Sequence, residues 1–230
     1  MGANSIGAFI RITTLRRRLA ELLPPNCERV FEAGCGTAAV LAQLRPFFPG
    51  AALSGIDIDP DLIRRAQERI PEGKFWVADL TQFTGSANQD LVLNVDVLEH
   101  IEDYQAALRG MLSCLKPGGL LALHTPNETQ RRLLPVRLLQ EHHQHDHVRE
   151  GYNLDTLASD MEALGAEVLH KERTVGTFGA LLWDIDFIAR KAYPMNLLLL
   201  PVLKLFARVD IGSCHPQGNG LLIIAKKKGA

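Results

Sequence analysis

Residues 32–38, Glu-Ala-Gly-Cys-Gly-Thr-Ala, form a glycine-containing segment of the kind that can bind an anionic or nucleotide ligand. The segment lies between an apolar run that favours a strand and a stretch with helical spacing, so backbone N–H groups and a helix N-terminus can face the ligand. Gly34 and Gly36 let a ligand approach the backbone closely. The pattern alone is weak, because ordinary strand-to-helix turns and dinucleotide sites share it.

Asp57 follows the next apolar run, about twenty residues beyond the glycine segment, where a carboxylate can accept hydrogen bonds from both hydroxyls of a ribose. The alternative role is to cap the helix that begins at Pro60. Asp59 suits that role better, because it directly precedes a proline in the first helical position. We therefore predict that Asp57 binds a ribose.

Asp79 follows a third apolar run, at residues 74–77. Open sheets of alternating strands and helices bind ligands at the carboxyl ends of their strands. The Asp79 side chain can there accept a hydrogen bond from the exocyclic amine of adenine. This position favours the ligand role, and capping of a turn is the alternative.

Five of the eight histidines lie in two segments: His100, and His142, His143, His145 and His147. Histidine transfers protons near neutral pH, because its unperturbed pKa is about 6.5. These side chains are therefore candidates for a general base. The alternative is a solvated polar loop in which one histidine caps the helix that follows.

Asp96, Glu99 and His100 are spaced at i, i+3 and i+4, so they would share one face of a helix. Carboxylates and imidazoles are ligands of divalent metals, and His147 could supply a fourth ligand. The pattern keeps a metal site open as an alternative, whereas our prediction for this chain contains no metal.

Alternating strands and helices must position these residues. We expect strands at residues 29–33, 51–56, 74–77, 90–95, 120–125, 167–172 and 221–225, and helices at residues 6–23, 38–44, 61–70, 104–115 and 154–164. The alternation indicates an α/β fold with a mostly parallel sheet covered by helices on both faces. A tight turn is expected at residues 116–119, Lys-Pro-Gly-Gly.

The length of 230 residues, with 47% hydrophobic and 22% charged residues, is typical of one globular domain spanning residues 1–230. We divide it into a leading helix at residues 1–25, a cofactor-binding half at 26–126 and an acceptor-side half at 127–230. A formal net charge of -1 argues against a nucleic-acid partner. The four cysteines form no C-x-x-C pair, which favours a reducing, cytoplasmic setting.

An apolar helical insertion is expected at about residues 179–209, and residues 197–206 within it are richer in apolar side chains than a solvated helix. Its longest apolar stretch, residues 194–207, contains Pro201 and Lys204 and is shorter than the ~20 residues that a membrane-spanning helix needs. Something must cover this surface. The insertion could pack on the core as a lid, or residues 194–209 could meet a lipid-like acceptor, a membrane surface or the second subunit of a homodimer.

Taken in order, the segments EAGCGTA, GIDIDP, VADL, DLVLNVDVLEHI and LKPGG resemble the motif series of class I S-adenosylmethionine-dependent methyltransferases. The resemblance covers residues 29–125. The later segments TPN and HVREGY resemble the small-molecule branch that includes ubiquinone-biosynthesis methyltransferases. Ala38 stands where the family has a third glycine, which is a tolerable change. The resemblance implies a Rossmann-like fold of about seven strands, the last of them antiparallel.

The resemblance also implies roles for individual residues. Glu32, Gly34 and Gly36 would line the methionine and ribose portions of S-adenosylmethionine. Asp57 would hold the ribose, and Ile58, Asp79 and Leu80 would meet the adenine. Asn94, Val95 and Asp96 would face the methionyl amine. The product would be S-adenosylhomocysteine.

The catalytic residues implied by the resemblance are His147 and His100. His147, with Arg149 and Tyr152, resembles a stretch that borders the acceptor site in related enzymes, so we predict His147 as the general base. The possible ligands around Glu99 partly resemble the metal site of small-RNA 2′-O-methyltransferases and quinone O-methyltransferases. Asp96 stands where those enzymes carry Glu, and the Leu-Glu-His triplet also occurs in relatives without metal.

We therefore predict methyl transfer to a small, hydrophobic or amphipathic acceptor, first of all at oxygen. The alternatives are methylation at nitrogen or carbon of a small molecule, 2′-O-methylation of RNA, a non-catalytic cofactor-binding module, and an NAD-dependent oxidoreductase. The sequence lacks the Tyr-x-x-x-Lys pair of many such oxidoreductases. An amphipathic acceptor would fit an enzyme that lies in the cytoplasm or at the periphery of a membrane.

Overall fold

The computed structural model describes residues 5–131, 133–134, 147–191, 195–211, 213 and 215–229, with the backbone alone for 195–197. Within these residues, seven strands form one sheet in the order β3-β2-β1-β4-β5-β7-β6. The strands are β1 (Arg29–Ala33), β2 (Ala52–Asp57), β3 (Lys74–Val77), β4 (Gln89–Val95), β5 (Leu115–Pro126), β6 (Ala166–Thr174) and β7 (Gly220–Lys227). Neighbouring strands run parallel, except that β7 is antiparallel to both β5 and β6. The predicted fold class is confirmed.

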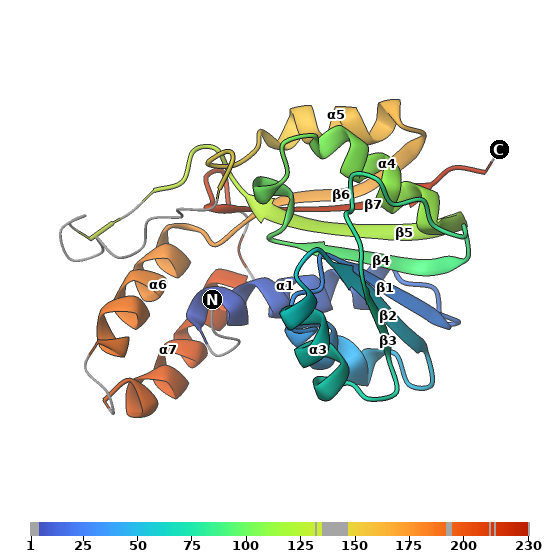
Figure 1. Ribbon diagram of the computed structural model, residues 1–230. Coiled ribbons are helices and arrows are strands. Elements are labelled where there is room, and N and C mark those ends of the chain that lie inside the picture. The colour runs from blue at the N-terminus through green and yellow to red at the C-terminus, as the bar shows by residue number, and fades with distance from the viewer. Residues whose placement is uncertain are drawn as a thin grey trace.

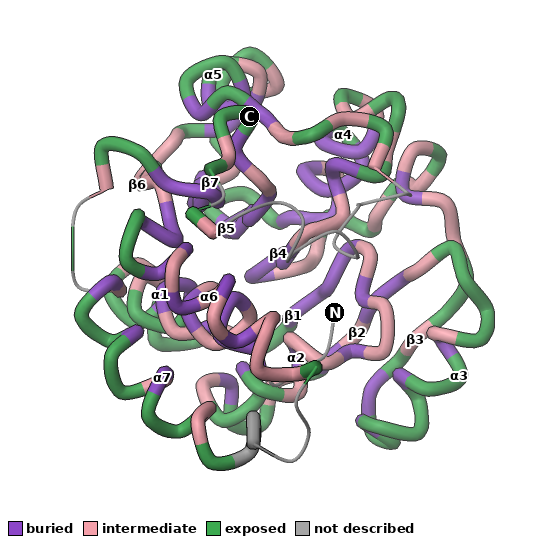
Figure 2. Tube along the Cα trace, turned by 90° about the vertical axis from the view of Figure 1, so that its left-hand side faces the viewer, coloured by how far each residue is buried: buried purple, intermediate pink, exposed green. Residues whose placement is uncertain are grey.

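Helices cover both faces of the sheet (Figure 1). The helices α4 (Tyr104–Cys114) and α5 (Leu154–Ala163) pack on one face, while α1 (Ile6–Leu22), α2 (Ala39–Leu44) and α3 (Pro60–Arg69) pack on the other. Each face has its own apolar core, and the strands β1, β4, β5 and β7 contribute side chains to both. The central strands are accordingly buried (Figure 2). Strands covered on two faces explain the nearly continuous apolar runs in the sequence.

The strand order reverses between β1 and β4, because β1 is followed by β2 on one side and β4 by β5 on the other. Open α/β sheets bind ligands in the crevice at such a point, outside the carboxyl ends of the strands. The glycine segment follows β1 and the short 3-10 helix η2 (Leu98–His100) follows β4. The topology therefore brings both groups of predicted site residues to one edge.

The predicted helical insertion is a pair of helices, α6 (Thr177–Arg190) and α7 (Met195–Ile211). Together with the N-terminal half of α1 they form a third apolar cluster beside the sheet, which includes Ile6, Ile10 and Leu203. In Figure 1 the two helices stand apart from the sheet on the left. The insertion begins earlier than expected, because Gly176 is the residue before the first turn of α6.

Two local predictions can be compared with the backbone. Asp59 caps α3 by accepting hydrogen bonds from the N–H groups of Asp61 (2.8 Å) and Leu62 (3.3 Å), as expected for a cap before Pro60. The expected turn at residues 116–119 belongs to the start of β5, with Gly118 in the left-handed region at φ +79°. The ladder between β4 and β5 shifts register at this place, so the turn forms a bulge at the beginning of the strand.

Candidate active site

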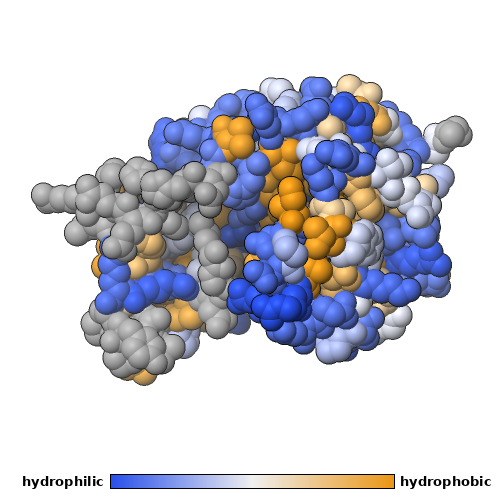
Figure 3. Space-filling view, in the orientation of Figure 1, coloured by the Kyte–Doolittle hydropathy of each residue, from blue (hydrophilic) through white to orange (hydrophobic). Residues whose placement is uncertain are grey.

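A cavity of about 1120 Å³ opens at the carboxyl edge of the sheet. It extends from the glycine segment after β1 to the histidines after β4 and β5. In the orientation of Figure 1, hydrophobic side chains gather in a band across the centre of the surface (Figure 3). Ligand pockets usually measure about 300–1000 Å³, so this cavity has room for a nucleoside cofactor and a small second molecule together.

Gly34 and Gly36 both adopt left-handed backbone conformations, at φ +73° and +51°. A Cβ on Gly34 would lie 2.4 Å from a methyl carbon of Val97, so that position requires glycine for packing as well as for conformation. A Cβ on Gly36 would meet nothing within 4 Å. Gly36 therefore leaves open space in front of the backbone, which a bound ligand can occupy.

Glu32, at the end of β1, is 2% exposed and lines the cavity. Burial raises the pKa of its carboxyl group to about 8. One carboxyl oxygen, Oε2, is buried without a hydrogen-bond partner among the described residues. Unsatisfied buried polar atoms are costly. A ligand that donates a hydrogen bond here, as a ribose hydroxyl or an amine does, would satisfy this oxygen, so the residue fits the expected cofactor.

Asp57 ends β2 on the strand next to Glu32, and its carboxylate is half-buried. It accepts hydrogen bonds from the N–H of Gly36 (2.7 Å) and from the N–H of Asp59 (3.1 Å). Since a carboxylate has about four acceptor positions, these two bonds fix its orientation and leave capacity for a ligand. The capping role belongs to Asp59, as predicted.

The residues expected around adenine also line this cavity: Ile58, Asp79 and Leu80. Ile58 is 70% exposed, which makes it a free apolar surface for a flat ring. The Asp79 carboxylate accepts hydrogen bonds from the N–H (2.9 Å) and the hydroxyl (2.8 Å) of Thr81. Asp79 thus caps a turn, which was the alternative to a ligand role, and its contact with adenine stays a prediction.

The three residues at the end of β4 lie in different surroundings. Val95 and Asp96 line the cavity. Asn94 is fully buried, its side-chain N–H donates to the carbonyl of Ala33 (2.9 Å), and it is not among the lining residues. Asn94 therefore holds the backbone of Ala33, the residue before Gly34, by a hydrogen bond. Its direct contact with the methionyl amine stays a prediction.

Asp96 belongs to a buried polar chain that the sequence did not reveal. Its carboxylate pairs with the guanidinium of Arg11 from α1 and lies 2.6 Å from Nδ1 of His124 on β5. Burial lowers the pKa of His124 well below its ordinary value, so the ring is neutral. Asp96 can only accept, so Nδ1 carries the proton and Nε2 accepts from the hydroxyl of Thr174 (2.9 Å).

Arg11 lines the cavity beside Asp96. Its side chain is only 12% exposed, and burial lowers its pKa to about 10, so it remains charged at neutral pH. One nitrogen, Nη1, donates to Asp96. A guanidinium has five donor hydrogens, and the other nitrogens of Arg11 have no partner among the described residues, which leaves them available to an anionic group.

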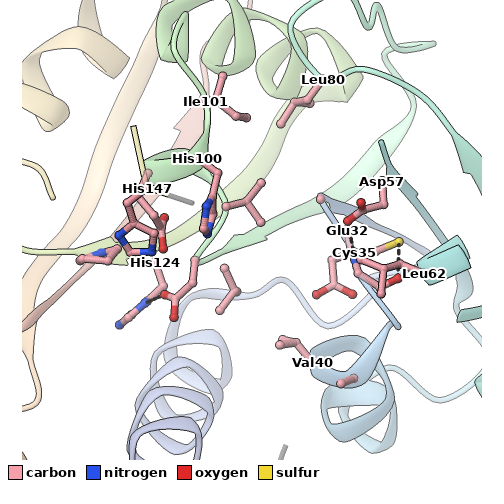
Figure 4. A pocket seen from close by; sticks show the side chains of 18 of the residues that line it. Glu32, Cys35, Val40, Asp57, Leu62, Leu80, His100, Ile101, His124 and His147 are labelled. Atoms are coloured by element: carbon pink, nitrogen blue, oxygen red, sulfur yellow. Dashed lines mark hydrogen bonds and ion pairs between the residues drawn. The ribbon is translucent and has the colours of Figure 1, made fainter. Parts of the chain in front are cut away.

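The two predicted catalytic histidines meet on the other side of the cavity from the glycine segment (Figure 4). The rings of His100 and His147 lie edge to face with their centroids 4.6 Å apart. His100 is exposed and His147 is half-buried. His142, His143 and His145 lie outside the described residues. The structure thus brings together the two histidines that the sequence singled out.

Hydrogen bonds hold His147 beside His100. The N–H groups of Val148 (3.0 Å) and Arg149 (3.4 Å) donate to the carbonyl of Glu99. The guanidinium of Arg149 donates to the carbonyl of Glu102 (2.7 Å) and stacks over the ring of Tyr152. The stretch from His147 to Tyr152 is therefore hydrogen-bonded to the segment that carries His100. This stretch is the one predicted to border the acceptor site.

Glu99, the residue before His100, is only 1% exposed. Its Oε2 accepts a hydrogen bond from the hydroxyl of Thr125 (3.2 Å). Burial raises the pKa of this carboxyl group to about 7. Glu99, His100 and His147 each offer one atom that could bind a metal ion, and these three atoms lie within 4.8 Å of one another. Ligand atoms of one divalent ion lie up to about 4 Å apart, so a modest adjustment would allow these three residues to hold a metal.

Asp96 does not belong to that group of three. The segment after β4 is a short 3-10 turn that begins at Leu98, and Asp96 precedes it with φ +52°. The expectation that Asp96, Glu99 and His100 share one helical face therefore fails. The carboxylate of Asp96 points instead to Arg11 and His124.

Sequence reasoning missed Arg11, His124 and Trp183, all of which line the cavity. Arg11 interrupts an apolar stretch on the leading helix, and His124 interrupts an apolar strand near its carboxyl end. A polar residue in an apolar run was a usable signal for both. Trp183, on α6, gave no signal, because a tryptophan in an apolar helix is indistinguishable from a core residue.

Comparison with known proteins gives a consistent result. A model of the methyltransferase-domain family matches residues 8–171. The trans-aconitate 2-methyltransferase of Rhizobium meliloti (strain 1021) is 31% identical over 131 residues, which are 57% of this chain and 50% of that protein. This chain thus spans about half the length of the curated relatives it matches.

Solved structures share the fold at low sequence identity. Phosphoethanolamine N-methyltransferase 2 of Haemonchus contortus, in complex with S-adenosyl-L-methionine, superposes with a TM-score of 0.68 at 19% identity, covering 99% of this chain and 55% of that one. An S-adenosylmethionine-dependent methyltransferase from Archaeoglobus fulgidus gives 0.61 at 17% identity, covering 95% and 94%. With the family match over most of its length, this chain belongs to the class I S-adenosylmethionine-dependent methyltransferases.

Proposed function

We propose that this protein transfers the methyl group of S-adenosylmethionine to an oxygen atom of a small-molecule acceptor. The observation that carries the proposal is the single cavity joining the glycine segment to the pair His100 and His147. A cavity that ends at two neighbouring imidazoles suits a reaction in which an oxygen loses a proton as it gains a methyl group.

Glu32, Gly36 and Asp57 would hold the cofactor, by accepting hydrogen bonds from its hydroxyl and amino groups and by leaving space beside the backbone. Ile58 and Leu80 would enclose the adenine. When bound, S-adenosylmethionine supplies an electrophilic methyl group on a sulfonium. The protein's own task is then to place an acceptor oxygen in line with that methyl group and to exclude water.

His147 is our candidate for the general base, with His100 beside it. The two rings lie edge to face with their centroids 4.6 Å apart, so either imidazole could take the proton of an acceptor hydroxyl placed beside them. The backbone bonds to the Glu99 carbonyl keep His147 in place. The acceptor is proposed to be hydrophobic or amphipathic, because Trp183, Val175 and Ile101 line the cavity near the polar groups.

A carboxylate oxygen is the second candidate for the acceptor atom, and Arg11 is the observation that favours it. Its buried guanidinium has donors to spare and can bind a carboxylate. The curated relative named above is a trans-aconitate 2-methyltransferase, a name that indicates an acidic acceptor. A carboxylate is already ionised at neutral pH and needs no general base.

The first experiment is calorimetric titration with S-adenosylmethionine, S-adenosylhomocysteine and NAD. We expect binding of the first two and none of NAD. Acceptor panels of phenols, quinols and small carboxylic acids, including trans-aconitate, would then be assayed for S-adenosylhomocysteine release. Absence of S-adenosylmethionine binding to the intact protein would refute the proposal.

Two variants separate the candidate acceptors. For a hydroxyl acceptor, His147→Ala should lower kcat by about 100-fold and flatten its pH profile, while Arg11→Gln changes KM at most. For a carboxylate acceptor, Arg11→Gln should raise KM strongly and His147→Ala should leave kcat nearly unchanged. Assays with EDTA and with added Mg²⁺, Mn²⁺ or Zn²⁺ test the metal alternative at Glu99, because a metal requirement would give loss and recovery of activity.

A further inference from the structure

The outward face of α7 consists of apolar side chains: Leu198, Val202, Leu205, Phe206 and Val209. Their spacing of four, three, one and three residues places them on one side of the helix. Each is at least 48% exposed, with Leu198 at 81%. Solvated helices carry polar residues on this side, so this surface, here called the α7 face, requires a partner.

The orientation of α7 is fixed from its opposite side. Leu203, Ala207 and Asp210 are buried. The Asp210 carboxylate accepts hydrogen bonds from the N–H groups of Gly176 (3.1 Å) and Gly179 (2.8 Å) at the start of α6. A buried carboxylate that caps a neighbouring helix is not readily turned outward. The apolar residues therefore face away from the protein because of the way α7 is anchored.

The carboxylates of the acidic residues of α6 are also bonded to groups within the protein. Asp186 accepts from the N–H of Ile6 at the start of α1 (3.0 Å) and pairs with Arg190. Asp184 accepts from the N–H groups of residues 133 and 134. Together with Asp210, these are the three acidic residues of the described parts of α6 and α7, and all of them point inward.

The basic residues of the same helices remain near the surface. Arg208 on α7 and Lys191 just after α6 are exposed, whereas Lys204 is half-buried with its ammonium over the ring of Phe9 from α1. Arg17, on the outside of α1, reaches the C-terminal end of α7 by donating to the carbonyl of Ile211 (3.3 Å). Glu21, an exposed acid one turn further along α1, pairs with Arg17 and Arg18. Two cations, Arg208 on α7 and Arg17 at its C-terminal end, thus lie close to the α7 face in a protein whose formal net charge is -1.

We propose that the α7 face docks on the surface of an anionic lipid bilayer. An apolar helix face with cations close to it fits a layer with apolar chains beneath negatively charged headgroups. A second copy of this chain is the alternative occupant, and the oligomeric state of the protein distinguishes it from a bilayer in the test below. Among the described helices, none is long and apolar enough to span a membrane.

Docking would place the cavity beside the bilayer. Helix α6, against which α7 packs, contributes Trp183 to the cavity wall, and α1 contributes Gly7 and Arg11. An amphipathic acceptor could then enter from the lipid side. The docking itself does not depend on the acceptor or on methyl transfer, so the test below can fail or succeed separately from the proposed function.

The test is co-sedimentation of the whole protein with vesicles of phosphatidylcholine alone or with phosphatidylglycerol added. We expect binding to the anionic vesicles, weak binding to the neutral ones and loss of binding at high salt. The double variant Leu205→Ser, Phe206→Ser should reduce binding at least tenfold. Arg208→Gln should reduce it about fivefold. Val77→Ser, at an exposed apolar residue of β3, and Arg64→Gln, at an exposed cation of α3, are the matched controls.

A second readout uses Phe206→Trp, whose emission should shift to the blue and be quenched by bilayer-embedded quenchers. Thermal unfolding curves and S-adenosylmethionine titrations of every variant check that the fold is intact. The proposal is overturned if wild-type protein stays in the supernatant, or if the double variant binds like wild type. It is also overturned if light scattering shows a dimer that the double variant converts to a monomer, since a second copy then covers the face.

Discussion

The two ends of the cavity are built in opposite ways. At the end that is proposed to bind the cofactor, here called the cofactor end, Glu32, Gly36 and Asp57 come from one strand-turn-helix-strand unit, residues 29–57. At the end that is proposed to bind the acceptor, here called the acceptor end, Arg11, His124 and His147 come from segments far apart in the sequence. A site made from one local unit keeps its residue spacing and can be recognised as a motif. A site made from distant segments has no spacing to recognise.

The ends also differ in how their polar atoms are satisfied. The cofactor end keeps an unpartnered oxygen on Glu32 and spare acceptor capacity on Asp57. At the acceptor end, Arg11 is paired with Asp96, and His124 is held between Asp96 and Thr174. The first end is ready to accept donors from a ligand, whereas the second end offers an anion the nitrogens of Arg11 that Asp96 does not occupy. Substitutions at the two ends should therefore have different consequences.

The largest effect is expected from Asp57→Ala, which removes both predicted ribose contacts and the bond to Gly36. Loss of two charge-assisted hydrogen bonds should weaken S-adenosylmethionine binding on the order of 1000-fold, measured by calorimetry. Asp61→Ala, an exposed acid in the first turn of α3, is the matched control and should bind normally. Equal affinity of both variants for S-adenosylmethionine would show that Asp57 does not bind the cofactor.

Gly34→Ala and Gly36→Ala should separate packing from ligand access. Both place alanine in the left-handed region, which costs about 1–2 kcal/mol. Gly34→Ala adds a clash with Val97, so its free energy of unfolding should fall by about 3 kcal/mol in denaturant titrations. Gly36→Ala should lose only about 1–2 kcal/mol, from backbone strain, and should lose cofactor affinity in addition. The reverse pattern would mean that Gly36 is a packing residue.

The pH dependence of binding should identify Glu32. Its folded pKa of about 8 lies above the ordinary 4.5, so its contribution to stability is fully present below pH 4.5 and is lost as pH rises through 8. If the ionised carboxylate accepts hydrogen bonds from the cofactor, affinity should rise about tenfold per pH unit below 8. Calorimetry from pH 6 to 8.5 measures this slope. Glu32→Gln should bind weakly with a flat profile, and an equally steep slope in this variant would point to another group.

The smallest effect concerns the acceptor end. The Tyr152 hydroxyl donates to the carbonyl of Leu98 (2.8 Å), which ties the segment after His147 to the turn carrying His100. Tyr152→Phe should lower the free energy of unfolding by about 1 kcal/mol and should lower kcat without changing cofactor affinity. Tyr104→Phe, which removes a hydroxyl that donates to the carboxylate of Asp160 (2.8 Å), is the control. A change in cofactor affinity in Tyr152→Phe would contradict the separation of the two ends.

The fold and the cofactor end were largely predictable. The alternation of apolar runs and helical spacings predicted the sheet, and the caps of its helices followed local rules, as at Asp59. The roles of individual residues were less accessible. Asn94 and Asp79 had the expected types at the expected places, but their side chains bond to Ala33 and Thr81 within the protein. The direction in which a side chain points depends on neighbouring residues, and the sequence alone does not show where those neighbours lie.

The sequence by itself determined the family, the alternation of strands and helices and the place of the glycine segment between β1 and α2, because these depend on local propensity and on motifs with fixed spacing. Tertiary structure alone decided that Arg11 reaches Asp96, that His147 meets His100, and that α7 turns its apolar side outward. Each of these results from hydrogen bonds or packing between segments tens of residues apart. Such contacts form only when the whole core is assembled, so no local pattern encodes them.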